Sequence, residues 1–256
     1  MQGRRRFLRQ LACVLAGAGG VSLPGAPSAK PREAGGSGAD VDVTLFLCGD
    51  VMLGRGLDQI LPHPSDPALH EEFVDDARRY LDLAEAESGP IPRPVAYDYV
   101  WGDALRELQR RRPDARIVNL ETAVTRSDAA WPGKGIHYRM DPRNAGVLAA
   151  AGIDACCLAN NHVLDWGYEG FADTLAALHG AGIRVAGAGA SLAAARAPAV
   201  LSLAHGRRVL LFAAATNDAG VPERWSAGND RAGVHRLPDL SSATVERIAD
   251  DVARHR

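Results

Sequence analysis

Oxygen- and nitrogen-bearing side chains follow three apolar runs of strand length in this sequence. Asp50 ends "VTLFLCGD", Glu121 ends "ARIVNLE", and Asn160, Asn161 and His162 follow "DACCLA". Carboxylate and amide oxygens bind divalent cations, and an imidazole serves as a ligand or as a general acid. Ligand sites of open α/β sheets form where the strands deliver their carboxyl ends. The spacing therefore predicts a metal or polar-ligand site.

Each of these side chains has an ordinary structural interpretation when it is taken alone. Asp50, at a strand-to-helix junction, is typical of a helix N-cap. Glu121 is typical of a solvated turn residue, or of a capping partner for Thr122 and Thr125, and His162 of a hydrogen-bonded histidine near the core. The conjunction of three such strand ends favours the ligand site.

The elements that must position these residues alternate along the chain. Strand-like apolar runs are followed by helix-like segments that stop at glycine, which is typical of βαβ units. We therefore predict an α/β fold, a layered and mostly parallel sheet flanked by helices. The predicted strands are 41–50, 115–121, 153–160 and 183–189, the predicted helices are 51–61, 100–112, 142–152, 167–182 and 241–256, and residues 198–204 and 207–216 form a predicted hairpin.

Three motifs carry a resemblance to a known family. "CGDVMLGR" at 48–55, "NLETAVT" at 119–125 and "ANNHVLDWG" at 159–167 resemble successive motifs of the CapA family of capsule and poly-gamma-glutamate biosynthesis proteins. Two further segments, "IHYRMDP" at 136–142 and "AGAG" at 186–189, resemble the family more loosely. The CapA domain is similar to the calcineurin-like metallophosphatases, so the resemblance implies a metallophosphatase-like fold.

The resemblance also implies roles for individual residues. Asp50 matches the first metal-binding aspartate of the family, Glu121 stands where an acidic ligand is expected, and Asn161 matches the metal-binding asparagine. His162 matches the histidine that faces the scissile group. Asp165, three residues later, would fix the tautomer of His162 or cap the next helix.

Substrate binding is expected from three other polar residues. Arg55 would meet an anionic group of the substrate, although an exposed helix arginine is the ordinary alternative, and Asn119 and Asn160 would line the site. The implied cofactor is one or more divalent metal ions, of manganese, iron, zinc or magnesium. The expected partners are an anionic polymer or a small-molecule substrate, and other capsule-synthesis proteins.

The sequence departs from the family after residue 216. The family continues with His-containing motifs, "HWG" and "HSSH", and the neighbours of His205, His235 and His255 do not match them. We therefore expect the carboxyl-terminal part of the domain to be missing and at most one weakly held metal. The alternatives are a metal-dependent hydrolase, an accessory protein that binds an anionic capsular polymer without turnover, and an inactive truncated remnant.

The first residues predict export. Arg4 and Arg5 precede "RFL", a short apolar run follows, and "GAPSAK" offers small residues for a signal peptidase. This order resembles a twin-arginine signal peptide over 1–29, with the periplasm or the outer face of the cell envelope as the expected destination. An amphipathic helix docked on the domain is the alternative.

The remaining organisation follows from composition. A Gly-, Pro- and Ser-containing linker is predicted at 30–41 and a CapA-like domain at 42–256, with an insertion at 62–97 that carries one helix. The net charge of −2 argues against a nucleic-acid partner, and the apolar run of the signal is too short to span a membrane. Cys48, Cys156 and Cys157 are predicted to be thiols of the core.

Overall fold

The computed structural model describes residues 42–256, and these divide into two compact units. Residues Thr44–Leu237 form the larger unit, and Pro238–Arg256 belong to the smaller one together with residues 42 and 43. The smaller unit contains helix α8 (Ser242–His255), whose N-cap Ser241 accepts a hydrogen bond from the backbone N–H of Thr244. The predicted signal peptide and linker lie outside the described residues.

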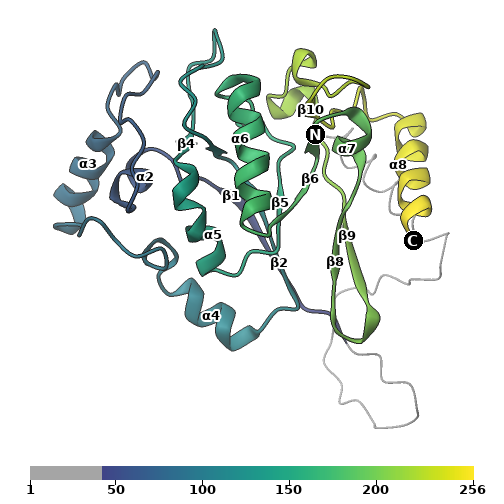
Figure 1. Cartoon of the computed structure of the whole chain (residues 1–256), viewed down its shortest axis with the longest axis horizontal. Coiled ribbons are helices and arrows are strands. Elements are labelled where there is room, and N and C mark those ends of the chain that lie inside the picture. The colour runs from purple at the N-terminus through teal and green to yellow at the C-terminus, as the bar shows by residue number, and fades with distance from the viewer. Residues whose placement is uncertain (1–41) are drawn as a thin grey trace. The chain divides into compact units, whose positions relative to one another are not determined.

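A four-stranded sheet organises the larger unit. Its strands lie in the order β1 (Leu45–Val51), β2 (Ala115–Leu120), β5 (Ala155–Cys157) and β6 (Arg184–Ala186), and each neighbouring pair is parallel. Helices flank this sheet (Figure 1). The predicted α/β architecture with a mostly parallel sheet is confirmed, and it is consistent with a metallophosphatase-like fold.

Side chains of β2 and β5 alternate between two apolar clusters, as the two-residue period of a strand requires. Val118 and Cys156 are fully buried on the face covered by α5 (Gly146–Ala150) and α6 (Gly167–Gly180). Those helices contribute the buried side chains of this cluster, Val147, Leu148, Phe171 and Leu178.

The opposite face of the sheet is covered by the predicted hairpin. Strands β8 (Ala199–Ser202) and β9 (Arg208–Leu211) pair antiparallel, and Leu201 packs with Ile117 and Ala155. His205 and Gly206 have positive φ angles of 59° and 71° at the turn, so the hairpin prediction is confirmed.

The predicted helix over 51–61 is wrong in its first half. Strand β1 continues through Val51, whose carbonyl accepts a hydrogen bond from Glu121 N, and helix α2 is confined to Gly56–Ile60. Arg55, at φ 53°, separates the two elements. Because the ladder with β2 takes the backbone groups through Val51, the apolar residues there belong to the sheet.

The other helices and strands are short. The predicted helix within 62–97 is present as α3 (Arg78–Ser88), and the helix predicted at 100–112 is present as α4 (Ala104–Arg111). The parallel pair β3 (Ala123–Val124) and β4 (Arg139–Met140) and the antiparallel pair β7 (Ala188–Gly189) and β10 (Gly233–Val234) complete the strands. The remaining elements are helix α7 (Leu192–Arg196) and the 3-10 helices Tyr99–Trp101, Pro142–Ala145, Ala204–Gly206, Asn217–Ala219 and Glu223–Trp225.

Within residues 42–256, no helix is both long enough and apolar enough to cross a bilayer. Cys156 is buried, as predicted for a core thiol, whereas Cys48 and Cys157 are half-buried.

Candidate functional site

The carboxyl ends of β1 and β2 place two predicted residues side by side. A β-bulge between Cys48 and Asp50 brings Asp50 opposite Asn119 in the parallel register. The Nδ2 of Asn119 donates a hydrogen bond of 2.6 Å to Oδ1 of Asp50. Asp50 is exposed, so its second oxygen faces solvent-accessible space at the edge of the sheet.

The amide of Asn160 ties the loop after β5 to the same edge. Its Nδ2 donates to Oδ1 of Asn119 at 3.2 Å and to the carbonyl of Leu120 at 2.9 Å, and its Oδ1 accepts from His162 N at 3.0 Å. Asn160 is buried and uses its amide within the chain. Asn119 and Asn160 therefore form a chain of amides that supports Asp50 and His162.

His162 and Asp165 form a buried pair. Nδ1 of His162 lies 2.7 Å from Oδ2 of Asp165, which also accepts a hydrogen bond from Tyr138 N at 2.7 Å. Helix α6 has Trp166 at its N-cap, so of the two alternatives for Asp165 the structure favours the contact with the histidine. Nε2 of His162 lies 4.0 Å from Oε1 of Glu121, on the side of the ring away from Asp165.

Glu121 is half-buried between charged neighbours. Partial burial raises the pKa of its carboxyl, and the negative charge of Asp50 raises this pKa further. His162 and Lys134 act in the opposite direction without reversing the shift. A nearby cation would lower the pKa of Glu121 again, because it favours the charged form of the carboxyl.

Asn161 follows Asn160 in the loop after β5 and lies against Gly220. A Cβ at Gly220 would lie 3.0 Å from Cβ and 3.3 Å from Nδ2 of Asn161. The Asn161 side chain makes no hydrogen bond to any described residue, so its amide oxygen is available. The three predicted ligands thus come from β1, from the end of β2 and from the loop after β5.

The donor chemistry limits which metal these residues fit. Across residues 42–256, no three side chains of the histidine, cysteine, aspartate and glutamate types gather into a metal-binding group. Two carboxylates and one amide remain, a set of oxygen donors that fits one hard cation, such as Mg²⁺ or Mn²⁺, better than Zn²⁺.

Arg55 is held by three side chains instead of pointing into solvent. Its Nε donates to Oε1 of Glu71 at 2.6 Å, and its guanidinium carbon lies 4.9 Å from the ring centroids of both Tyr80 and Tyr138. Its positive φ, unusual for a residue other than glycine, adds backbone strain of the kind found at functional sites. Arg55 precedes α2, so it is not the exposed helix arginine of the alternative interpretation.

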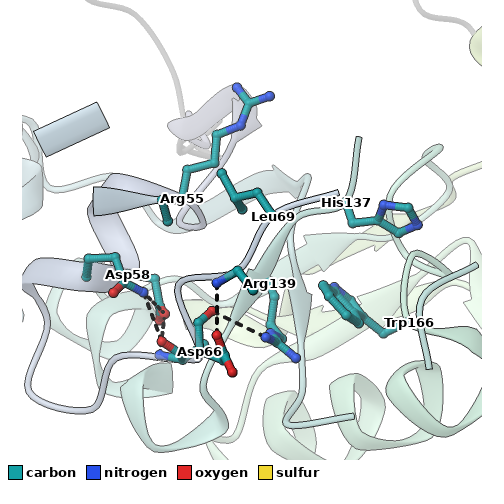
Figure 2. A pocket seen from close by; sticks show the side chains of 11 residues that line it. Arg55, Asp58, Asp66, Leu69, His137, Arg139 and Trp166 are labelled. Atoms are coloured by element: carbon teal, nitrogen blue, oxygen red, sulfur yellow. Dashed lines mark hydrogen bonds between the residues drawn. The ribbon is translucent and has the colours of Figure 1, made fainter. Parts of the chain in front are cut away.

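A small, partly open cavity is lined by Arg55, Arg139 and Trp166 among others (Figure 2). It has a volume of about 10 Å³, and Arg139 lies across it between Asp66 and Trp166. The Arg139 guanidinium carbon is 4.1 Å from the Trp166 ring centroid, and its NH2 donates to the Asp66 carbonyl at 3.3 Å. The cavity is too small for a substrate.

The sequence did not indicate two residues of the site, Lys134 and Tyr138. Nζ of Lys134 lies 3.0 Å from Oδ1 of Asp165, and the Tyr138 ring stacks on His162. Both belong to the irregular segment between β3 and β4. Each residue still has a feature in the sequence that could have drawn attention to it. Tyr138 lies in "IHYRMDP", which resembles the family, and Lys134 is the single lysine of residues 42–256.

Comparison with known proteins places these residues in a family. The family model of the bacterial capsule synthesis protein PGA_cap matches residues 44–256. Proteins named "probable polyglutamine synthesis accessory protein" from two strains of Mycobacterium tuberculosis are 48% identical over 211 residues, which are 82% of this chain and 55% of each relative. An uncharacterised protein of Sinorhizobium fredii is 38% identical over 145 residues, 53% of this chain and 31% of the relative.

The extent of these matches decides what they show. The chain spans about half the length of the curated relatives from Mycobacterium tuberculosis. The family model, in contrast, covers the whole larger unit, including all three strand ends of the candidate site. The chain therefore belongs to the PGA_cap family of bacterial capsule synthesis proteins, as its three motifs indicated.

Proposed function

We propose that this chain is an exported accessory protein of capsule or poly-gamma-glutamate synthesis, and that its sheet edge carries a metal-dependent hydrolase site of the metallophosphatase type. The names of its family and of its Mycobacterium tuberculosis relatives support the accessory role in synthesis, whereas export rests on the sequence of residues 1–29. The second part is carried by one observation. The Nε2 atom of His162 faces Glu121 at 4.0 Å while Nδ1 is held by Asp165.

The residues present fit a division of roles at this edge. Asp50, Glu121 and Asn161 would hold the cation with oxygen donors. A divalent cation, when bound, supplies Lewis-acid polarisation of a phosphoryl or acyl oxygen and activation of water. His162, oriented by Asp165, would donate a hydrogen bond or a proton to the leaving oxygen.

The substrate class follows from the family and from the exposed edge. We propose a phosphoester, or an amide of poly-gamma-glutamate, as the group that is cleaved. Arg55 would contribute its positive charge to recognition of an anionic polymer or small molecule, although Glu71 at 2.6 Å neutralises much of that charge. Asn119 and Asn160 would act in binding through the support they give to Asp50 and His162.

A second candidate is binding of an anionic polymer without turnover. The specific observation in its favour is the absence, within residues 42–256, of any group of three or more histidine, cysteine, aspartate or glutamate side chains arranged for a metal. A site with one weakly held cation would bridge polymer carboxylates without the second cation that two-metal hydrolysis uses.

The deciding experiment measures metal binding and hydrolysis together. Calorimetric titration of the full chain with Mn²⁺ is followed by assay of bis(p-nitrophenyl) phosphate and of poly-gamma-glutamate. We expect the double variant Asp50→Asn/Glu121→Gln to lose both Mn²⁺ binding and hydrolysis. Asp114→Asn, an exposed carboxylate at the start of β2, is the matched control and should retain them. Polymer binding without metal uptake or product would instead support the second candidate.

Export is proposed from the sequence alone. Replacing Arg4 and Arg5 by lysine should keep the protein in the cytoplasm of a host with a twin-arginine system. Fractionation followed by immunodetection measures this, with an Arg78→Lys/Arg79→Lys variant as the matched control. Unchanged export of the Arg4/Arg5 variant would contradict the proposal.

A further inference from the structure

Lys134 has an unusual place in the chain. It is the single lysine of residues 42–256, where every other basic side chain apart from histidine is arginine. Its side chain is only 19% exposed and reaches the buried pair of His162 and Asp165. Arginine would serve equally well for an exposed charge on a surface loop. Lys134 is instead largely buried within the site, so its position calls for a physical reason.

The ammonium group of Lys134 has two acceptor atoms and a third close contact, because Nδ1 of His162 carries the proton that it donates to Asp165. Nζ donates to the Ile136 carbonyl at 2.7 Å, lies 3.0 Å from Oδ1 of Asp165 and lies 3.3 Å from Nδ1 of His162. A compact ammonium fits between the Ile136 carbonyl and the Asp165 carboxylate, whereas the larger planar fork of a guanidinium does not.

The segment around Lys134 is anchored on Asp165 from both sides. Trp131 N donates to the Asp165 backbone carbonyl at 2.7 Å, and Tyr138 N donates to its Oδ2, also at 2.7 Å. The two carboxylate oxygens of Asp165 therefore differ, because Oδ1 accepts no hydrogen bond and has only the ion pair with Lys134. Oδ1 faces Lys134, while Oδ2 is left for Tyr138 N and His162 Nδ1.

We propose that Lys134 is a positioning residue of this site. Its ammonium group fixes the plane of the buried Asp165 carboxylate and thereby the ring of His162 that faces Glu121. The effect of Lys134 on catalysis rests on the proposed function. Its effect on the orientation of Asp165 and His162 does not, because it concerns the metal-free protein. Without Lys134, the Asp165 carboxylate is held only through Oδ2, because Oδ1 loses its counter-ion inside the protein.

The test follows the His162 ring by NMR in the metal-free full chain. The protein is labelled with ¹³C and ¹⁵N in its eight histidines, and His162→Gln assigns the signal. In Lys134→Met and Lys134→Arg, we expect the His162 ring signals to shift or broaden more than those of the distant His63 and His179. Methylammonium added to Lys134→Ala should restore them. Arg111→Met, which removes an exposed ion pair with Glu107, is the control and should leave them unchanged.

The outcomes separate this inference from the proposed function. Unchanged His162 signals in both Lys134→Met and Lys134→Arg would overturn the positioning role. If the wild-type chain hydrolyses a phosphodiester with Mn²⁺, Lys134→Met should lower kcat about 10–100-fold with little change in KM, as for other residues that orient a functional group. Absence of hydrolysis in the wild type would defeat the proposed function, and the NMR comparison would still decide the geometric claim.

Discussion

Tyr138 lies face to face with His162, with the ring centroids 4.0 Å apart and the ring planes 21° from parallel. Its phenol ring also lies 4.9 Å from the guanidinium carbon of Arg55, and its backbone N–H is bonded to Asp165. One residue therefore contacts the predicted acid, its orienting carboxylate and the predicted anion-binding arginine. These residues lie far apart in the sequence, so the sequence alone does not indicate that Tyr138 contacts them.

Replacing Tyr138 tests how far this stacking fixes the site. Tyr138→Phe keeps the ring and should leave the free energy of unfolding nearly unchanged. Tyr138→Ala removes the stack on His162 and the cation–π contact with Arg55, and it should lower that free energy by at least about 1 kcal/mol more than Tyr138→Phe. Urea denaturation measures both. Equal losses in the two variants would show that the ring contacts contribute nothing.

The contact of Asn161 with Gly220 gives a second prediction. Gly220→Ala places a methyl group 3.0 Å from Asn161 Cβ at a φ of 78°, whereas Gly206→Ala meets nothing within 4 Å at a φ of 71°. Left-handed backbone strain of about 1–2 kcal/mol is common to both. Only Gly220→Ala should also weaken Mn²⁺ binding, because Asn161 must move. Calorimetric titration of the two variants measures the difference, and equal affinities would remove Asn161 from the ligand set.

Much of the sheet edge was predictable because it depends on local pattern. The apolar runs that end at Asp50, Glu121 and Asn160 are strands with consecutive positions in one parallel sheet, so their ends meet. The spacing of three residues between His162 and Asp165 allowed the contact that is observed. The family assignment followed from the same motifs.

The contacts that complete the site were not predictable from local pattern. Lys134 and Tyr138 lie in an irregular segment whose path is set by hydrogen bonds to Asp165, and no periodicity reports such bonds. Arg55 pairs with Glu71, 16 residues away, and α2 lies between them in the sequence. The ladder between β1 and β2 is likewise a long-range contact, and it overrides the local tendency that predicted a helix from residue 51.

Burial of Cys156 gives a prediction about thiol reactivity. Burial raises the pKa of Cys156 to about 12, from an ordinary value of 9.0. The folded state therefore holds this proton more tightly than the unfolded chain, and the contribution of Cys156 to stability falls as the pH rises from 9 towards 12. At pH 9, iodoacetamide should modify half-buried Cys48 in the native protein and spare Cys156. Peptide mass mapping measures this, with a urea-unfolded sample as the control in which both react.

Asp239 gives the opposite pH dependence, in the smaller unit. Hydrogen bonds from the Ser241 side chain, from Ser241 N and from the Thr244 hydroxyl lower the pKa of Asp239 from 3.8 to about 2. Because the folded-state pKa is depressed, the stabilisation is complete above pH 4 and is lost as the pH falls towards 2. Ser241→Ala should return this pKa towards 3.8 in a ¹³C NMR titration of the carboxyl groups. A pKa that stays near 2 would assign the shift to other groups.

The hydrogen bond from Asn119 to Asp50 marks a position where an added carboxylate tests the proposed cation site. Asn119→Asp replaces the donor, 2.6 Å from Asp50 Oδ1, by a second carboxylate, while an oxygen that accepts from Asn160 is kept. Two charges about 4 Å apart repel by about 1–4 kcal/mol between bulk water and a protein surface, so the metal-free variant should be less stable. A bound cation removes that repulsion. Mn²⁺ should therefore bind Asn119→Asp more tightly than wild type and stabilise it more.

Asn119→Ala is the matched control for this last prediction, because it removes the same hydrogen bond to Asp50 without adding charge. It should destabilise the protein and leave Mn²⁺ affinity unchanged or lower. The gain in Asn119→Asp should also shrink in the presence of an added Asp50→Asn substitution, since the cation then loses one of the two carboxylates that it bridges. Thermal unfolding with and without Mn²⁺ measures all three variants. If Asn119→Asp and Asn119→Ala respond equally to Mn²⁺, the cation does not bind beside Asp50, and the metal site proposed at this edge is in the wrong place.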